Sequence, residues 1–170
     1  MTGVILAAGI ALRLRPLTDG LPKCLLPVGG TPLLQRSLDA LSHAGVHRCF
    51  IVTGYLHEKI EQFVATYHPP LEIEFIHNPA FAETNNNYSL WLTRPAVSGE
   101  DIVLLDADIL FHHAILTRLL SSPHKDALII RTAGSLGHEE IKCELDGDGA
   151  VVRIAINPVH ACVLELPHVP

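Results

Sequence analysis

Residues 6–30 read LAAGIALRLRPLTDGLPKCLLPVGG, a stretch in which an apolar run gives way to a loop of glycine, proline and cationic residues. The overlapping run GVILAA, residues 3–8, is typical of a buried parallel strand that ends at Gly9. About twenty residues without a helical or strand period follow, a length at which loops are usually functional or disordered. We therefore expect a ligand to bind at the loop that leaves this first strand.

Strand-like and helix-like segments alternate along the rest of the chain. The helix expected over residues 31–45 has both ends marked, because Thr31 and Pro32 suit the N-cap and N1 positions and Gly45 suits C′. Residues 141–155 predict a hairpin whose turn, at Gly147 and Asp148, suits positive φ. Further strands are expected over residues 48–54, 72–78, 101–108 and 126–132, and further helices over residues 57–67, 88–96 and 112–122.

This alternation predicts an α/β fold with a doubly wound, mostly parallel sheet. The chain has 170 residues, which is the size of one ordinary domain, so we expect a single domain over residues 1–170. In such folds, ligands bind at the carboxyl ends of the strands. The loop after the first strand leaves the sheet at that edge.

Composition limits the classes of partner. Asp and Glu number 18 against 12 for Lys and Arg, and this net negative charge argues against general nucleic-acid binding. No apolar stretch approaches the roughly 18 residues of a membrane span, and the N-terminus lacks the pattern of a signal peptide, so a cytoplasmic location is expected without membrane contact. The oligomeric state is left open. The four cysteines are far apart and predict reduced thiols, and the spacing of His43 and His47 is interpreted as structural.

The loop gathers cations in an otherwise acidic protein. Arg13, Arg15 and Lys23 follow Gly9, which would let the backbone approach a base or a phosphate closely. The pattern is neither a P-loop nor a dinucleotide-binding fingerprint. It nevertheless suits a polyphosphate ligand.

Two carboxylates close the strand expected at residues 101–108. Asp106 and Asp108, in the tripeptide DAD, are hard oxygen ligands of the kind that suits Mg²⁺, which needs one or two carboxylates plus phosphate oxygens. The alternative is that Asp108 caps the next helix.

Three amides precede the helix expected at residues 88–96. Asn85, Asn86 and Asn87 offer the donors and acceptors with which a nucleobase edge is recognised. The alternative is a polar turn that ends in a helix N-cap.

The loop sequence resembles the signature of the nucleotidyltransferases that make activated sugars and alcohols, in outline L-A-A-G-x-G-[ST]-R-L-x-P-L-T-x-x-x-P-K-x-L-x-P-V. The resemblance implies a Rossmann-like nucleotide-diphospho-sugar transferase fold in which Ala7, Ala8 and Gly9 line the nucleotide. Arg13 would hold the triphosphate, and Lys23 would reach toward the acceptor phosphate. It also singles out Asp108, with Asp106 beside it, as the ligand of a Mg²⁺ cofactor.

The chain departs from the signature at two positions. Ala11 stands where the family has its second glycine, and Leu12 stands where it has Ser or Thr. The resemblance covers about residues 1–156, while the tail over residues 157–170 diverges and the C-terminal part is expected to be shortened. Members of the family carry a second acidic metal ligand, for which Glu165 is a remote candidate.

The segment NNNYSL is similar to the N-N-x-Y-S-L stretch of the phosphocholine cytidylyltransferase branch. That likeness favours CTP as the nucleotide and a phosphorylated alcohol as the acceptor, with a sugar-1-phosphate as the other class. Tyr88 and Trp91 are candidates for the aromatic faces that a choline group needs.

The function that follows is a Mg²⁺-dependent nucleotidyltransferase that transfers CMP from CTP to such an acceptor and releases pyrophosphate. Two alternatives stay open. The first is a nucleotide-binding or regulatory module that has lost turnover. The second is a glycosyltransferase that binds its metal through a D-x-D motif, although the cations of the loop do not fit that class.

Overall fold

The computed structural model describes residues 1–130 and 142–155 of the chain. Its contacts group into two compact units, Met1–Ser121 and Ser122–Pro170. Within the described residues, no helix is both long enough and apolar enough to cross a bilayer.

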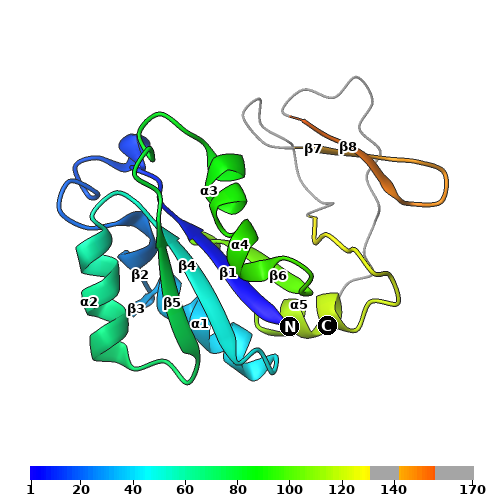
Figure 1. The fold of residues 1–170 in the computed structure, drawn as a ribbon, viewed down its shortest axis with the longest axis horizontal. Helices are drawn as coiled ribbons and strands as arrows, with labels where there is room; N and C mark the ends of the chain where they lie inside the picture. The colour runs from blue at the N-terminus through cyan, green and yellow to red at the C-terminus, as the bar shows by residue number, and fades with distance from the viewer. Residues whose placement is uncertain (131–141, 156–170) are drawn as a thin grey trace. The chain divides into compact units, whose positions relative to one another are not determined.

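The first unit is built on a four-stranded parallel sheet (Figure 1). The order of its strands is β5-β4-β1-β6, and every neighbouring pair runs in parallel. All six residues of β1 are buried, as expected of a strand that is covered on both faces. The strands are β1 (Thr2–Ala7), β4 (Arg48–Thr53), β5 (Glu72–His77) and β6 (Ile102–Asp106).

Helices cover both faces of this sheet, so the predicted doubly wound architecture is confirmed. On one face, Ile5 and Ile51 pack with fully buried side chains of α1 and α2, such as Leu38 and Ile60. On the other face, a smaller cluster around Val4 packs against α3 and α4. The helices are α1 (Leu33–His43), α2 (His57–Tyr67), α3 (Asn86–Leu92), α4 (Arg94–Val97) and α5 (Ala114–Leu120), the last of which packs on the first face.

The structure corrects the ends of three predicted helices. The helix expected over residues 112–122 is shorter, since α5 spans Ala114–Leu120. Thr31 is not the N-cap and Pro32 is not N1, because the two residues form the short strand β3 (Thr31–Pro32), which pairs with β2 (Pro27–Val28). The N-cap of α1 is Pro32, and the helix begins at Leu33. The helix expected over residues 88–96 begins two residues earlier and divides at Thr93 into α3 and α4. Gly45, by contrast, follows the C-cap of α1 with φ 80°, as predicted.

In the second unit, the hairpin pairs β7 (Lys142–Leu145) with β8 (Val151–Ala155). Its turn differs from the prediction, because the positive φ belongs to Gly149 and the Asp146 carboxylate accepts from the backbone N–H groups of Asp148 and Ala150. The strand predicted over residues 126–132 is wrong for residues 126–130, which form no strand; residues 131 and 132 lie outside the described residues.

The strand order places a topological switch point between β1 and β6. The chain leaves β1 toward β4 and β5 on one side, and β6 adds later on the other side. A crevice forms at such a point beyond the carboxyl ends of the two strands, where ligands of doubly wound sheets bind. The loop after β1 and the DAD tripeptide of β6 both begin there.

Candidate active site

The first part of the site is the turn that leaves β1. Ala7 and Ala8 are buried, and the Ala8 carbonyl accepts a hydrogen bond from the backbone N–H of Tyr55 at 3.1 Å. Gly9 is exposed, and a Cβ built on it meets no atom within 4 Å. The backbone at Gly9 therefore borders open space, into which a flat or charged ligand can come close.

Arg13 is displayed on a single 3₁₀ turn, η1 (Leu12–Leu14). The turn starts at Ala11, whose φ of 55° lies in the left-handed region that favours glycine, and this explains why the related signature has glycine there. The Ala11 carbonyl accepts from the Leu14 N–H at 3.0 Å and from the hydroxyl of the buried Thr18 at 3.1 Å. The exposed Arg13 thus stands on a locally bonded turn.

Lys23 is the charged residue of a second 3₁₀ turn, η2 (Lys23–Leu25). The other two residues of the turn pack in the hydrophobic core. Cys24 and Leu25 are buried, and burial raises the pKa of the Cys24 thiol to about 12, so this cysteine is an inert core residue. The Lys23 Nζ lies 2.5 Å from Oδ2 of Asp108. This ion pair joins the loop after β1 to the end of β6, across 85 residues of sequence.

Asp106 occupies the last position of β6, and Asn86 donates from Nδ2 to its Oδ1 at 3.0 Å. Desolvation is the main cause that raises the pKa of Asp106, and the negative charge of Asp108 raises it further, while Lys23 opposes the shift. The two carboxylates therefore repel each other electrostatically. The hydrogen bond from Asn86 links the start of α3 to the same site.

The donor set fits one hard divalent cation that shares its coordination with phosphate. Mg²⁺ binds through one or two carboxylates and completes its octahedron with phosphate oxygens and water. Asp106 and Asp108 match that requirement. Across residues 1–130 and 142–155, no three His, Cys, Asp or Glu side chains gather as a metal site. Glu165 lies outside the described residues.

The three asparagines have different surroundings. The Asn85 side chain accepts from the N–H of Asn87 at 3.0 Å and caps α3, as the alternative interpretation predicted for this segment. Asn86 is bound to Asp106. Among the described residues, the Asn87 side chain makes no hydrogen bond, so of the three it is the amide that stays available to a base.

Two residues that hold segments of the site in place were not predicted from the sequence. Asn78 is buried and bonds Thr84 and Ser89 through Nδ2, which ties the segment before α3 to the helix. The Tyr55 hydroxyl bonds the loop after β1. For Tyr55 there was a signal, because it follows a strand and a glycine at the carboxyl edge of the sheet.

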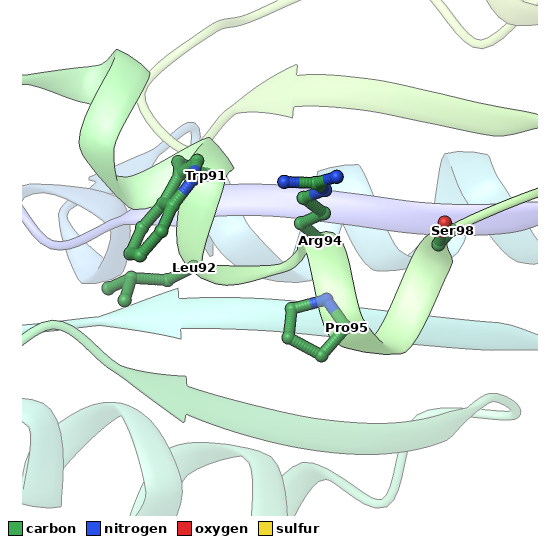
Figure 2. A pocket seen from close by; sticks show the side chains of 5 residues that line it. All are labelled: Trp91, Leu92, Arg94, Pro95 and Ser98. Atoms are coloured by element: carbon green, nitrogen blue, oxygen red, sulfur yellow. The ribbon is translucent and has the colours of Figure 1, made fainter.

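Aromatic side chains stack on α3. The rings of Tyr88 and Trp91 lie 5.5 Å apart between centroids at an interplanar angle of 23°, and Trp91 is 58% exposed. Trp91 also lines a hollow of about 520 Å³ (Figure 2). The other lining residues are Leu92, Arg94, Pro95 and Ser98, none of which belongs to the loop after β1 or to β6.

Comparison with known proteins gives a consistent result. Residues 3–153 match the MobA-like NTP transferase domain. A choline-phosphate cytidylyltransferase of Haemophilus influenzae is 35% identical over 161 residues, which cover 94% of this chain and 64% of that protein. A 2-aminoethylphosphonate cytidylyltransferase of Lancefieldella rimae is 30% identical over 154 residues, which cover 89% of this chain and 59% of that protein.

A solved structure agrees with these matches. The CTP:phosphocholine cytidylyltransferase from Streptococcus pneumoniae superimposes with a TM-score of 0.66 at 28% identity, and the match covers 91% of this chain and 63% of that one. The chain thus spans less than two-thirds of the length of each of these relatives.

Proposed function

The chain belongs to the MobA-like NTP transferase domain family, and from that premise we propose that it transfers CMP from CTP to a small phosphorylated alcohol and releases pyrophosphate. The observation that carries this proposal is the ion pair between Lys23 and Asp108 at the carboxyl edge of β1 and β6. It joins the cation that we propose to bind phosphate and the carboxylate that we propose to bind the metal, at the edge of the sheet where folds of this kind bind ligands.

In the proposed reaction, an anionic oxygen of the acceptor attacks the α-phosphorus of CTP. A bond forms between that oxygen and the phosphorus, and the bond from the phosphorus to the oxygen bridging to the β-phosphate breaks. The bridging oxygen leaves with pyrophosphate. Since the attacking oxygen is already ionised at neutral pH, no general base is required.

The residues then act by positioning and by charge. Arg13 would hold the triphosphate from η1, and Lys23 would stabilise the negative charge that builds up on the transferred phosphoryl group. Asp106 and Asp108 would hold Mg²⁺. When bound, Mg²⁺ supplies the positive charge that neutralises the phosphate oxygens.

Two observations support a small phosphorylated alcohol as the acceptor: the substrates named in the relatives, and two aromatic side chains on α3 of this chain. Choline phosphate and 2-aminoethylphosphonate, named in the two relatives, each carry a phosphorus oxyanion and a nitrogen cation. The half-buried Tyr88 and the exposed Trp91 offer the ring faces to which such a cation binds. Sugar-1-phosphates, which lack the cation, form the alternative acceptor class.

The test is pyrophosphate release by the full chain with Mg²⁺. CTP, UTP, dTTP, GTP and ATP are each combined with phosphocholine, 2-aminoethylphosphonate and a panel of sugar-1-phosphates. Asp108→Asn removes the proposed metal ligand, and Asp101→Asn, an exposed aspartate just before the other end of β6, is the matched control.

Release that requires CTP and one acceptor, that is lost in Asp108→Asn and that is kept in Asp101→Asn supports the proposal. Binding of a triphosphate without release in any combination favours the non-catalytic nucleotide-binding module. Release that persists in Asp108→Asn contradicts the assigned metal site.

A further inference from the structure

The turn between β4 and α2 contacts the loop after β1 at several points. The backbone N–H of Tyr55 donates to Ala8 at 3.1 Å, where the loop begins. The Tyr55 hydroxyl lies 3.2 Å from the Thr18 carbonyl and 3.1 Å from the Asp19 carbonyl, to which it donates. The ammonium of Lys59, in the first turn of α2, donates to the carbonyl of Gly20.

The local backbone is suited to this contact. A Cβ at Gly54 would lie 2.6 Å from the Cβ of Phe81 and 2.7 Å from the Ala8 carbonyl oxygen, so glycine lets the turn approach the start of the loop. The ring of Tyr55 lies 6.4 Å from that of Phe81, which helps to hold the tyrosine in place.

These bonds fall between the two cations of the proposed site. Thr18, Asp19 and Gly20 lie in the sequence between Arg13 and Lys23. Thr18 is fully buried, and its hydroxyl donates to the Ala11 carbonyl, from which the turn carrying Arg13 starts. On the other side, Lys23 follows Gly20 by three residues and leads into the buried Cys24 and Leu25. A displacement of residues 18–20 would therefore move both cations.

We propose that Tyr55 and Lys59 are positioning residues that hold the loop after β1 in the shape that binds a nucleoside triphosphate. The inference rests on the proposed function for the identity of the ligand. Neither side chain needs to touch the nucleotide. Each of their bonds raises the fraction of molecules whose loop is competent to bind, and the apparent affinity scales with that fraction.

The experiment compares Tyr55→Phe with Tyr67→Phe in the full chain. Both changes remove one hydroxyl group, but the Tyr67 hydroxyl donates to Asp39 on α1, at the opposite end of α2 from Tyr55. Lys59→Met serves as a second loop variant. The measurements are the rate of trypsin cleavage after Arg13 and Lys23 without nucleotide, the dissociation constant of CTP, and the steady-state KM and kcat.

We expect Tyr55→Phe to be cleaved faster at these two bonds and to bind CTP about fivefold more weakly, as the loss of one hydrogen bond predicts. KM for CTP should rise by a similar factor while kcat at saturating CTP changes little. Lys59→Met should act in the same direction, and Tyr67→Phe should match the wild type in all measurements.

Unchanged cleavage in Tyr55→Phe would overturn the proposal, as would faster cleavage with unchanged CTP affinity, because Tyr55 would then be structural only. Equal effects of Tyr67→Phe would also overturn it. A wild-type chain that binds no triphosphate contradicts the proposed function, whereas the cleavage rates, which are measured without nucleotide, test separately whether Tyr55 holds the loop.

Discussion

Lys23 and Asp108 form an ion pair in which 36% of the lysine side chain and 42% of the aspartate side chain are exposed. The Lys23 ammonium thus pairs with the Asp108 carboxylate, which the proposed reaction assigns to Mg²⁺. A cation that enters the site must therefore share or displace this ammonium. Bound triphosphate offers Lys23 other oxygens, so nucleotide binding would release Asp108 for the metal.

The first prediction follows from this competition. Lys23→Met should strengthen binding of Mn²⁺, used as a probe for Mg²⁺, to the nucleotide-free chain by about three- to fivefold, the value of a modest exposed ion pair. Electron paramagnetic resonance of free Mn²⁺ measures this affinity. Pyrophosphate release should nevertheless be lost, because the proposed reaction also needs Lys23 to bind phosphate. Lys125→Met, which removes an exposed lysine outside the first unit, is the control, and weaker Mn²⁺ binding in Lys23→Met would refute the competition.

The second prediction concerns Asp106, whose pKa is raised by desolvation and by Asp108. A carboxyl group with a higher pKa in the folded state binds its proton more tightly when folded, so the chain loses stability as pH rises through that pKa. Asp106→Asn should therefore increase the free energy of unfolding at pH 7 in EDTA. The gain should shrink toward acidic pH, where both states are protonated.

Urea denaturation at several pH values measures this gain, with Asp101→Asn as the control. The same Asp106→Asn variant should lose metal affinity, since an oxygen proposed as a metal ligand is replaced by an amide nitrogen. A loss of stability at neutral pH would show that the bond from Asn86 to Asp106 outweighs the repulsion from Asp108.

At the scale of elements, the sequence pattern predicted helices that depend on the spacing of their own apolar side chains, but not features that depend on pairing with a distant strand. The helix over residues 57–67 has the predicted bounds, because its apolar side chains recur at helical spacing. Thr31 failed as an N-cap because pairing with β2 took precedence over capping. Residues 126–130 have the composition of a strand, but strand formation needs a partner that composition does not reveal.

In the site, too, residue types could be predicted from the sequence, whereas contacts that depend on the fold could not. The loop signature and the DAD tripeptide identified Arg13, Lys23 and Asp108 as candidates, because their chemistry is visible in the residue types. The bond between Lys23 and Asp108 depends on the order of the strands. The capping role of Asn85 depends on where α3 begins, which is two residues earlier than its hydrophobic pattern suggested.

The third prediction separates capping from recognition in that segment. Asn85→Ala removes the N-cap of α3 and should lower the free energy of unfolding by about 1 kcal/mol, whereas Asn85→Asp keeps the cap. Asn87→Ala should leave stability nearly unchanged and weaken CTP binding. Thermal unfolding and CTP titration of the three variants measure both effects. If Asn87→Ala binds CTP as tightly as the wild type, the amide does not read the base.

At the scale of the whole molecule, the site exists only when the sheet is assembled. It draws on the loop after β1, on the start of α3 and on the end of β6, which lie far apart in the sequence. An unfolded chain cannot offer these groups together. A ligand that contacts all three segments therefore binds the folded state and stabilises the first unit as a whole.

The fourth prediction uses this linkage. CTP with Mg²⁺ at about 100 times its dissociation constant should stabilise the fold by about 2.7 kcal/mol, which raises the unfolding temperature by about 5 to 10 °C. The shift should be smaller in EDTA, smaller with UTP, GTP or ATP, and reduced in Asp108→Asn. Differential scanning calorimetry at fixed protein concentration measures it. Equal shifts with all triphosphates would mean that the chain holds the phosphates but does not select the base, and that recognition of CTP needs groups beyond Asn87.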